Sequence, residues 1–412
     1  MLLKIELSNF FSIKEIVCID FRAANIHTNR AKELAYNVMD WNGIKVLKSV
    51  GLFGPNASGK SNIIRAINFC CRMIFQSDQH NEGVVFNFKP FKFDGYQDKP
   101  SRFYINFVCE DIEYEYSFEL TTTEILRESL FYYPNGRKAK IFTRDEEAEQ
   151  VYSFGSVILR PQDVVVSTSR KNLFLSRASS MNREVAQRIY RYFYRTFMLS
   201  VVPTNDIQAQ LDFGKYKDLI LKAMAICDND IIDIEKREEI VNLPIPIIEG
   251  DNASATPVQK KVVRFKTRHR RDPQQVFDMS TEESAGTQRL FFTLMNLFDV
   301  LRNNKPIMID EFDIGLHTRL ADFILDLTHA SKGSQLLFTS HNTNLIDVKR
   351  LRRDQIVFVN KKEDSSTDVY SLYDYKDFRE NMDAEKAYLQ GRFDAVPYIE
   401  SSVSALKTLL EN

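Results

Sequence analysis

The chain has 412 residues, of which 44% are hydrophobic and 12% aromatic, and its formal net charge is -1. This composition can fill a large core and excludes intrinsic disorder. No apolar run approaches the roughly 18–20 residues that cross a membrane, and the first residues, MLLKIELSNF, do not read as a signal peptide. Five cysteines without metal or redox spacing indicate reduced thiols in a cytoplasmic protein.

The small net charge hides two basic segments. Residues 160–200 hold eight Arg or Lys against two acids, and residues 258–275 hold seven against one. Such segments either contact nucleic acid or an acidic surface of a partner, or they are simply solvated. The candidate contact residues are Arg188, Arg191, Arg195, Arg264, Lys266, Arg268, Arg270 and Arg271.

The first part of the chain predicts strand, loop and helix, followed by an antiparallel sheet. Alternating residues predict paired strands over 2–7 and 16–21, and an apolar strand over 46–53 that ends in a glycine-containing loop. The helix that follows places Ile63, Ile67 and Cys70 on its buried side. Two further strands are predicted over 102–120, around a turn at Glu110 and Asp111, and another over 124–133.

The second part predicts helices and then an α/β layer. Amphipathic periodicity indicates helices over 182–198, 215–227, 284–302 and 318–330. The proline-bearing stretch 243–258 is predicted to be a loop. Residues 306–310 and 335–339 are continuous apolar runs, which is typical of parallel strands buried on both faces.

A phosphate-binding loop is the most specific motif. Gly54-Pro-Asn-Ala-Ser-Gly-Lys-Ser61 fits G-x-x-x-x-G-K-[ST] and lies between a predicted strand and a predicted helix. Glycines let the backbone N–H groups face phosphates, the helix start adds partial positive charge, Lys60 reaches the β- and γ-phosphates, and Ser61 holds Mg²⁺. The nucleotide-binding candidates here are Gly54, Asn56, Gly59, Lys60, Ser61 and Asn62.

Three further signals follow in the second part. Asp310 and Glu311 end a buried strand, which suits Mg²⁺ binding by Asp310 and activation of water by Glu311 as general base. His341 follows the next strand and is placed to sense a γ-phosphate. Ser284 and Gly286 open a helix, which is either an ordinary N-cap or a second phosphate-binding end.

These elements, in this order, resemble the ABC-type ATPases of the RecF, SMC and OLD branch. Gly54–Ser61 matches Walker A, ESAGTQ at 283–288 matches the signature loop, Asp310–Glu311 matches Walker B, and His341 matches the switch histidine. The stretch LSNFFSIKE at 7–15 is similar to the opening strand and turn of RecF and OLD proteins. ESAGT at 283–287, DEFDIGLH at 310–317 and YLQGRFDAVPYI at 388–399 together are most similar to the compact ATPase subunits of bacterial abortive-infection systems. One departure concerns the glutamine expected between Walker A and the signature, for which Gln162 is a candidate by position only.

The resemblance implies an α/β ABC-type ATPase head with an N-terminal antiparallel β-subdomain and an inserted, largely helical middle region. We expect a first ATPase half over 1–145, a basic inserted region over 146–275 and a second ATPase half over 276–412. Two chains would sandwich ATP and Mg²⁺ between them, as a dimer or a higher even oligomer. Ser284 and Gly286 of one chain would then face the nucleotide of the other.

The resemblance leaves the purpose of ATP open between two main readings. The first is an anti-phage defence ATPase that controls a separate effector, a nuclease or a toxin, since the 71 residues after His341 contain no convincing nuclease metal site. The second is a RecF-like DNA-repair clamp whose basic segments contact DNA or RNA. A phosphotransferase and a membrane-transporter subunit are disfavoured by the ESAGT helix start and the long middle region.

Overall fold

The computed structural model describes residues 1–159, 161–197, 207–227, 230–249, 252–379 and 381–396. The chain forms two compact units. Unit 1 consists of Met1–Val201, Asn304–Phe312 and Leu325–Asn412, and unit 2 of Val202–Asn303 and Asp313–Ile324. The division into 1–145, 146–275 and 276–412 stays a prediction, and the described residues between 146 and 197 pack within unit 1. No helix in these ranges is long and apolar enough to cross a membrane.

A five-stranded sheet carries the phosphate-binding loop in unit 1. The strand order is β14-β15-β5-β16-β17, and the first four strands are parallel, whereas β17 is antiparallel to β16. The central strand β5 is buried along its whole length, as a strand covered on both faces should be. The strands are β5 (Ser49–Phe53), β14 (Pro306–Ile309), β15 (Gln335–Ser340), β16 (Ile356–Lys361) and β17 (Thr367–Ser371).

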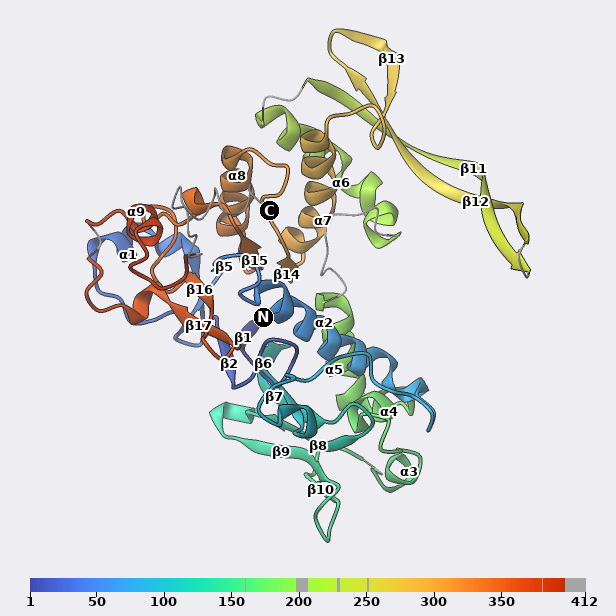
Figure 1. The fold of residues 1–412 in the computed structure, drawn as a ribbon, viewed down its shortest axis with the longest axis vertical. Helices are drawn as coiled ribbons and strands as arrows, with labels where there is room; N and C mark the ends of the chain where they lie inside the picture. Colours follow the sequence, from blue (N-terminus) through green and yellow to red (C-terminus); the bar gives the residue numbers. More distant parts are fainter. Residues whose placement is uncertain (160, 198–206, 228–229, 250–251, 380, 397–412) are drawn as a thin grey trace, which may run out of the picture. The chain divides into compact units, whose positions relative to one another are not determined.

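A seven-stranded antiparallel sheet forms the second layer of unit 1, in the order β10-β9-β8-β7-β6-β1-β2 (Figure 1). The predicted pairing of the first two strands is confirmed, because Lys4 lies opposite Asp20. The predicted turn is confirmed as well, with positive φ at Glu110 and Asp111. The strands are β1 (Leu2–Ser8), β2 (Val17–Asp20), β6 (Ser101–Cys109), β7 (Ile112–Leu120), β8 (Ile125–Tyr132), β9 (Ala139–Asp145) and β10 (Tyr152–Phe154).

Helix α2 packs against this antiparallel sheet. Phe69 of α2 lies 5.4 Å, ring centre to ring centre, from Phe103 of β6. Cys70 is buried beside it, as predicted, and so is Cys71. The predicted strand over 46–53 is two strands separated at Lys48. The other elements of unit 1 are α1 (Asn29–Glu33), β3 (Val38–Trp41), β4 (Ile44–Leu47), α2 (Lys60–Gln76), α3 (Pro161–Val166), α4 (Phe174–Ser180), α5 (Glu184–Phe197) and α9 (Ala384–Leu389).

One buried glutamine ties the two sheets together. The side-chain carbonyl of Gln335, at the start of β15, accepts a hydrogen bond from the Leu2 backbone N–H at 2.6 Å. Its amide group donates to the Leu2 carbonyl at 2.9 Å and to the Leu47 carbonyl at 3.2 Å. A fully buried amide with all these partners satisfied fixes β1 of one sheet against β15 of the other.

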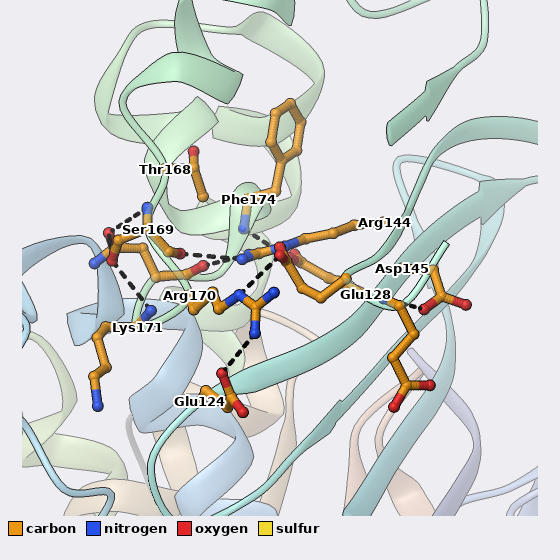
Figure 2. A network of polar contacts seen from close by, with 12 residues as sticks. Glu124, Glu128, Arg144, Asp145, Thr168, Ser169, Arg170, Lys171 and Phe174 are labelled. Atoms are coloured by element: carbon orange, nitrogen blue, oxygen red, sulfur yellow. Dashed lines mark hydrogen bonds and ion pairs between the residues drawn. The ribbon is translucent and has the colours of Figure 1, made fainter. Parts of the chain in front are cut away.

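A buried polar network attaches α4 to the outer strands of the antiparallel sheet (Figure 2). The Glu128 carboxylate on β8 accepts the backbone N–H groups of Phe174 and Leu175 at 2.6 and 2.9 Å, together with the Tyr116 hydroxyl at 2.9 Å. Arg144 on β9 donates to the carbonyls of Asn172 and Ser169 at 2.7 and 3.1 Å. These bonds satisfy the first turn of α4 and fix the loop before it.

Unit 2 consists of two packed helices and a long antiparallel ribbon, which runs away from α6 and α7 (Figure 1). Its core contains Phe213, Phe265 and Phe291, whose rings lie 5.0 to 6.1 Å apart. The elements are α6 (Ile207–Ile226), β11 (Ile231–Glu249), β12 (Asn252–His269), β13 (Asp272–Asp278) and α7 (Ala285–Arg302); α8 (Thr318–Ala330) begins in this unit and ends in unit 1.

The loop predicted over 243–258 is wrong, because β11 and β12 are paired up to Glu249 and Asn252. Pro244 and Pro246 are two residues apart, so their nitrogens face the same side of β11, and Pro244 lies opposite Pro257. Opposed residues in an antiparallel pair exchange either both hydrogen bonds or neither. The prolines therefore fit positions of the ribbon that need no N–H donor.

Candidate nucleotide-binding site

The loop between β5 and α2 has the shape of a phosphate cradle, and two glycines make it possible. A Cβ on Gly54 would lie 2.0 Å from the Val359 carbonyl oxygen. Gly59 has a φ of 112°, and a Cβ there would lie 2.0 Å from the Thr367 Oγ1. Only glycine fits both positions, so the backbone can curl and direct N–H groups into the loop.

Lys60 closes this loop from inside. Its Nζ donates to the carbonyls of Gly54 and Pro55 at 2.8 and 2.9 Å, and the side chain is buried. Burial lowers the pKa of Lys60 to about 8, although the nearby carboxylates of Asp310 and Glu311 act in the opposite direction. The ammonium is thus held where the phosphates of a nucleotide would replace its two carbonyl acceptors.

Asp310, at the end of β14, meets Ser61 across the sheet edge. The Ser61 hydroxyl donates to Asp310 Oδ1 at 3.1 Å, and the Thr339 hydroxyl donates to the same oxygen at 2.6 Å. Strands β14, β15 and β5 are adjacent and parallel, so their carboxyl ends reach one edge. The phosphate loop and Asp310 therefore meet as their shared Mg²⁺ role predicts, and Thr339 joins them as a residue that no sequence motif indicates.

Glu311 follows in an unusual backbone conformation, with a φ of 51°. Its N–H donates to the Thr339 hydroxyl at 2.7 Å, and the Phe312 N–H donates to the Thr339 carbonyl at 2.9 Å. A non-glycine residue at positive φ needs such fixation, and such residues gather at functional sites. His341 directly follows β15, and its side chain is exposed. Because β14 and β15 are adjacent parallel strands, His341 lies at the same sheet edge as Asp310.

The side chains at this edge fit Mg²⁺. The cation prefers hard oxygen ligands and usually takes only one or two from protein, with water and phosphate oxygens completing the octahedron. Ser61 and Asp310 supply a hydroxyl and a carboxylate already within 3.1 Å of each other. No group of three or more His, Cys, Asp or Glu within the described ranges could hold a metal, so a resident all-protein metal cage is not present there.

A second set of residues, which we call the outer clamp, supports the loop from behind. It comprises Ser12, Asn62 and Thr367. The Asn62 amide donates to Ser12 Oγ at 2.7 Å, Ser12 Oγ lies 2.8 Å from Thr367 Oγ1, and Thr367 Oγ1 donates to the Ser58 carbonyl at 2.9 Å. Asn62 was predicted to contact nucleotide and here holds the clamp; the role of exposed Asn56 stays a prediction.

The predicted signature loop begins α7 in unit 2. Ser284 caps the helix, because its hydroxyl accepts the Thr287 N–H at 3.1 Å. A Cβ on Gly286 would lie 3.2 Å from the Gly315 carbonyl oxygen, so the first turn of α7 packs closely on the segment after Walker B. Because α7 has 18 residues, its N-terminus carries a substantial partial positive charge.

Two groups of predicted residues lie away from this site. Gln162 is exposed on the short helix α3, which Figure 1 shows well apart from the start of α2, so it is a poor candidate for the missing Mg²⁺-linked glutamine. Many of the basic residues are paired with acids. Arg188 pairs with Glu110 and Glu184 at 3.2 and 3.3 Å.

The basic strand β12 is largely neutralised at its base. Arg264 and Lys266 lie on one face. Both pair with Asp278, at 3.3 and 3.0 Å, and with Glu239, at 3.0 and 3.7 Å. Arg268 donates to the Pro273 carbonyl at 2.9 Å, whereas Arg270 and Arg271 are exposed at the turn into β13. The side chain of Arg195 lies outside the described residues. Contact of these residues with nucleic acid stays a prediction.

Comparison with known proteins places this site in a family. Residues 49–347 match the family model described as AAA domain, putative AbiEii toxin, Type IV TA system. Comparison with curated protein sequences gave no significant match.

Solved structures with a similar arrangement include heads of SMC proteins. One is the SMC head domain from Thermotoga maritima, at 14% identity and a TM-score of 0.41, covering 90% of this chain and 98% of that one. Another is the Smc head with an extended coiled coil, bound to the C-terminal domain of ScpA and derived from Pyrococcus furiosus, at 14% identity and a TM-score of 0.39, covering 95% and 98%.

The family match includes the phosphate loop, the signature helix, Asp310, Glu311 and His341. It spans more than half of the chain, and the geometry of Lys60, Ser61 and Asp310 at one sheet edge agrees with it. The protein therefore belongs to this AAA-domain family and is a P-loop ATPase.

Proposed function

We propose that the protein is an ATP-driven dimerisation switch that controls a separate effector in anti-phage defence. One observation carries the nucleotide part: Ser61, Asp310 and Thr339 converge at the sheet edge next to the buried ammonium of Lys60. Membership of a P-loop ATPase family implies nucleotide binding, typically with Mg²⁺, and ATP hydrolysis in general. A slow, regulatory rate of hydrolysis is part of the proposal.

The chain's residues divide the work of phosphoryl transfer. Lys60 leaves the carbonyls of Gly54 and Pro55 and contacts the β- and γ-phosphates. Glu311 orients the attacking water and accepts its proton, and His341 contacts the γ-phosphate from the end of the neighbouring strand. Ser61 and Asp310 would hold Mg²⁺, which neutralises charge on the phosphate oxygens when bound. Catalysis is then positioning and charge stabilisation.

Dimerisation follows from the second phosphate-binding end of the chain. A single nucleotide is already surrounded by the loop 54–61, yet α7 also begins with a hydroxyl cap and a close-packed glycine at Ser284 and Gly286. In the ABC-type arrangement, this helix start faces the nucleotide held by a second copy. ATP thereby joins two chains, and hydrolysis lets them separate.

The description of the family supports the defence role, since it refers to a putative toxin of a type IV toxin–antitoxin system. The alternative, a RecF-like clamp on DNA, has weaker support. It needs a row of free cations, whereas Arg188, Arg264 and Lys266 already have carboxylate partners. Neutralised side chains release few counterions and contribute little to binding of a phosphate backbone.

Sedimentation of the Glu311→Gln variant with ATP and Mg²⁺ tests the switch. The variant binds ATP but cannot activate water, so we expect a stable dimer with ATP and a smaller species without it. Adding Lys60→Ala should abolish the dimer by removing ATP, and adding Ser284→Arg should abolish it while nucleotide binding persists. Failure of Glu311→Gln to self-associate with ATP bound would contradict the proposal.

The defence role needs a separate test in cells. The gene is expressed together with its chromosomal neighbours, and survival after phage infection is compared with that of cells carrying Lys60→Ala or Glu311→Gln. We expect protection with the unchanged chain and its loss with Lys60→Ala. Equal survival of all strains across a broad phage panel would argue against defence and would leave the ATPase assignment intact.

A further inference from the structure

A histidine at the base of the ribbon holds the residue immediately before the signature loop. His269 is the last residue of β12, and its Nε2 lies 2.8 Å from the Glu283 carboxylate. Its Nδ1 lies 2.8 Å from the Asp230 carboxylate, just before β11 begins. The Thr267 hydroxyl donates to the same oxygen of Glu283. Glu283 is mostly buried, and Ser284, the cap of α7, follows it directly.

The geometry defines the charge of His269. Carboxylates accept hydrogen bonds and do not donate them, so contacts from both ring nitrogens to carboxylates require two N–H donors, which only the imidazolium has. Burial lowers the pKa of His269, but the hydrogen bonds to Glu283 and Asp230 outweigh it, so that the pKa is raised above its usual value. Asp272 lies opposite His269 in β13, and Phe277 packs against the ring at 4.9 Å.

The contacts join three segments that are separate in the chain. Glu282 is tied to the same place, because its carboxylate accepts the Asp278 N–H at 2.5 Å, while Asp278 pairs with Lys266 of β12 at 3.0 Å. At the other end of the signature sequence 283–288, the side-chain amide of Gln288 donates to the Glu283 backbone carbonyl at 2.8 Å. The base of the ribbon and the first turn of α7 therefore share a buried, charged connection.

We propose that His269 is a positioning residue for the signature loop, which sets Ser284 and Gly286 through Glu283 and so couples the β11–β12 ribbon to the nucleotide of the partner chain. The catalytic part of this proposal rests on the proposed ATP sandwich. The mechanical part does not, because the connection lies within unit 2 and is made by His269 with Glu283 and Asp230.

Hydrogen exchange of the nucleotide-free protein tests the connection by itself. The variants are His269→Ala and Glu283→Gln, and Asp272→Asn is the control, since it removes a carboxylate from the same end of the ribbon without touching Glu283. We expect protection of residues 284–290 to fall about tenfold or more in both variants and to stay unchanged in the control. In the wild type, protection should also fall as pH rises through the raised pKa of His269, where the imidazolium loses its proton, and this dependence should vanish in His269→Ala.

ATPase kinetics then test the consequence. We expect kcat to fall about tenfold or more, as for other residues that orient a catalytic group, while KM for ATP stays within about twofold. Unchanged exchange and unchanged kcat would overturn the proposal, as would a general loss of protection throughout unit 2, which indicates a merely structural role. If Glu311→Gln fails to dimerise, the sandwich is wrong, yet the exchange data still decide whether His269 holds the loop.

Discussion

The Thr339 hydroxyl donates a 2.6 Å hydrogen bond to Asp310, and it also accepts the backbone N–H of Glu311. One side chain on β15 therefore holds the Asp310 carboxylate and the Glu311 backbone, although both residues lie in the turn after β14. A residue that orients a metal ligand is expected to contribute about 10- to 100-fold to activity or metal affinity.

The first prediction concerns this residue. Thr339→Val keeps the shape of the side chain but removes the hydroxyl, so Asp310 loses one of its two donors and the Glu311 N–H loses its acceptor. We expect kcat to fall about 10- to 100-fold and the Mg²⁺ concentration for half-maximal activity to rise. The measurement is steady-state ATPase activity over a Mg²⁺ titration. Thr339→Ser, which retains the hydroxyl, should stay near wild type, and an equal loss in both variants would contradict this role.

Gly59→Ala should damage the phosphate loop through the outer clamp. Its Cβ would lie 2.0 Å from Thr367 Oγ1 and 2.9 Å from Ser12 Oγ, at a φ of 112°. We expect loss of ATP binding and a clear fall in the free energy of unfolding, measured by calorimetry and urea titration. Gly43→Ala is the matched control, because Gly43 also has positive φ but its Cβ would meet nothing within 4 Å. It should cost only about 1 kcal/mol of backbone strain.

ATP affinity should depend on pH through Lys60. Burial lowers the pKa of its ammonium to about 8 in the nucleotide-free protein, and phosphates stabilise the charged form. Above pH 8 the free protein must therefore take up a proton to bind ATP, so Kd should rise by up to about tenfold per pH unit. Calorimetry in buffers of different ionisation enthalpy measures this uptake. Lys60→Arg stays charged and should show no such rise; a flat profile for the wild type would refute the assignment.

The buried Glu128 network should matter for stability and not for chemistry. Glu128→Leu leaves the N–H groups of Phe174 and Leu175 and the Tyr116 hydroxyl without their acceptor. We expect a loss of about 3 kcal/mol or more in the free energy of unfolding by urea. Glu124→Gln is the control, since its partner Arg170 is half-exposed and the pair is 3.0 Å apart. That change should cost less than about 1 kcal/mol.

Binding to DNA separates the two readings of the basic segments. With Arg264 and Lys266 neutralised by Asp278 and Glu239 together, we expect weak duplex binding that changes little with salt. A protein with 6–10 phosphate contacts would lose about 10³- to 10⁵-fold in affinity between 50 and 200 mM salt. Fluorescence anisotropy measures the DNA affinity across this salt range. The comparison is with the triple variant Arg268→Glu, Arg270→Glu and Arg271→Glu. A steep salt slope that the variant abolishes would favour the DNA clamp.

The motif-bearing elements could be predicted from sequence because local signals define them. The order of strand, glycine loop and helix around Lys60 is a local pattern, and the buried strands before Asp310 and His341 are continuous apolar runs. Since parallel strands end at one edge of a sheet, Lys60, Asp310 and His341 could be predicted from sequence to lie near one another. The helix predicted over 318–330 was found at Thr318–Ala330.

The supporting residues could not be predicted, because their partners are distant in the chain. Ser12 and Thr367 are 355 residues apart and meet only when β17 folds against the phosphate loop. Thr339 and His269 are ordinary strand residues until their acceptors are known. The ribbon was missed for another reason: prolines predict loops unless the chain supplies a pairing register in which their missing N–H groups are not needed, and register is not a local property.

The central position of β5 has a consequence for synthesis of the protein. Both of its neighbours in the sheet, β15 and β16, come from beyond residue 334. While the ribosome makes the 280 or so residues in between, this apolar strand has two open edges and no partner. Its pairing is among the most non-local in the chain, so nascent or truncated chains that lack β15 should be aggregation-prone clients of chaperones. The ATPase should mature only after β15 and β16 have been synthesised.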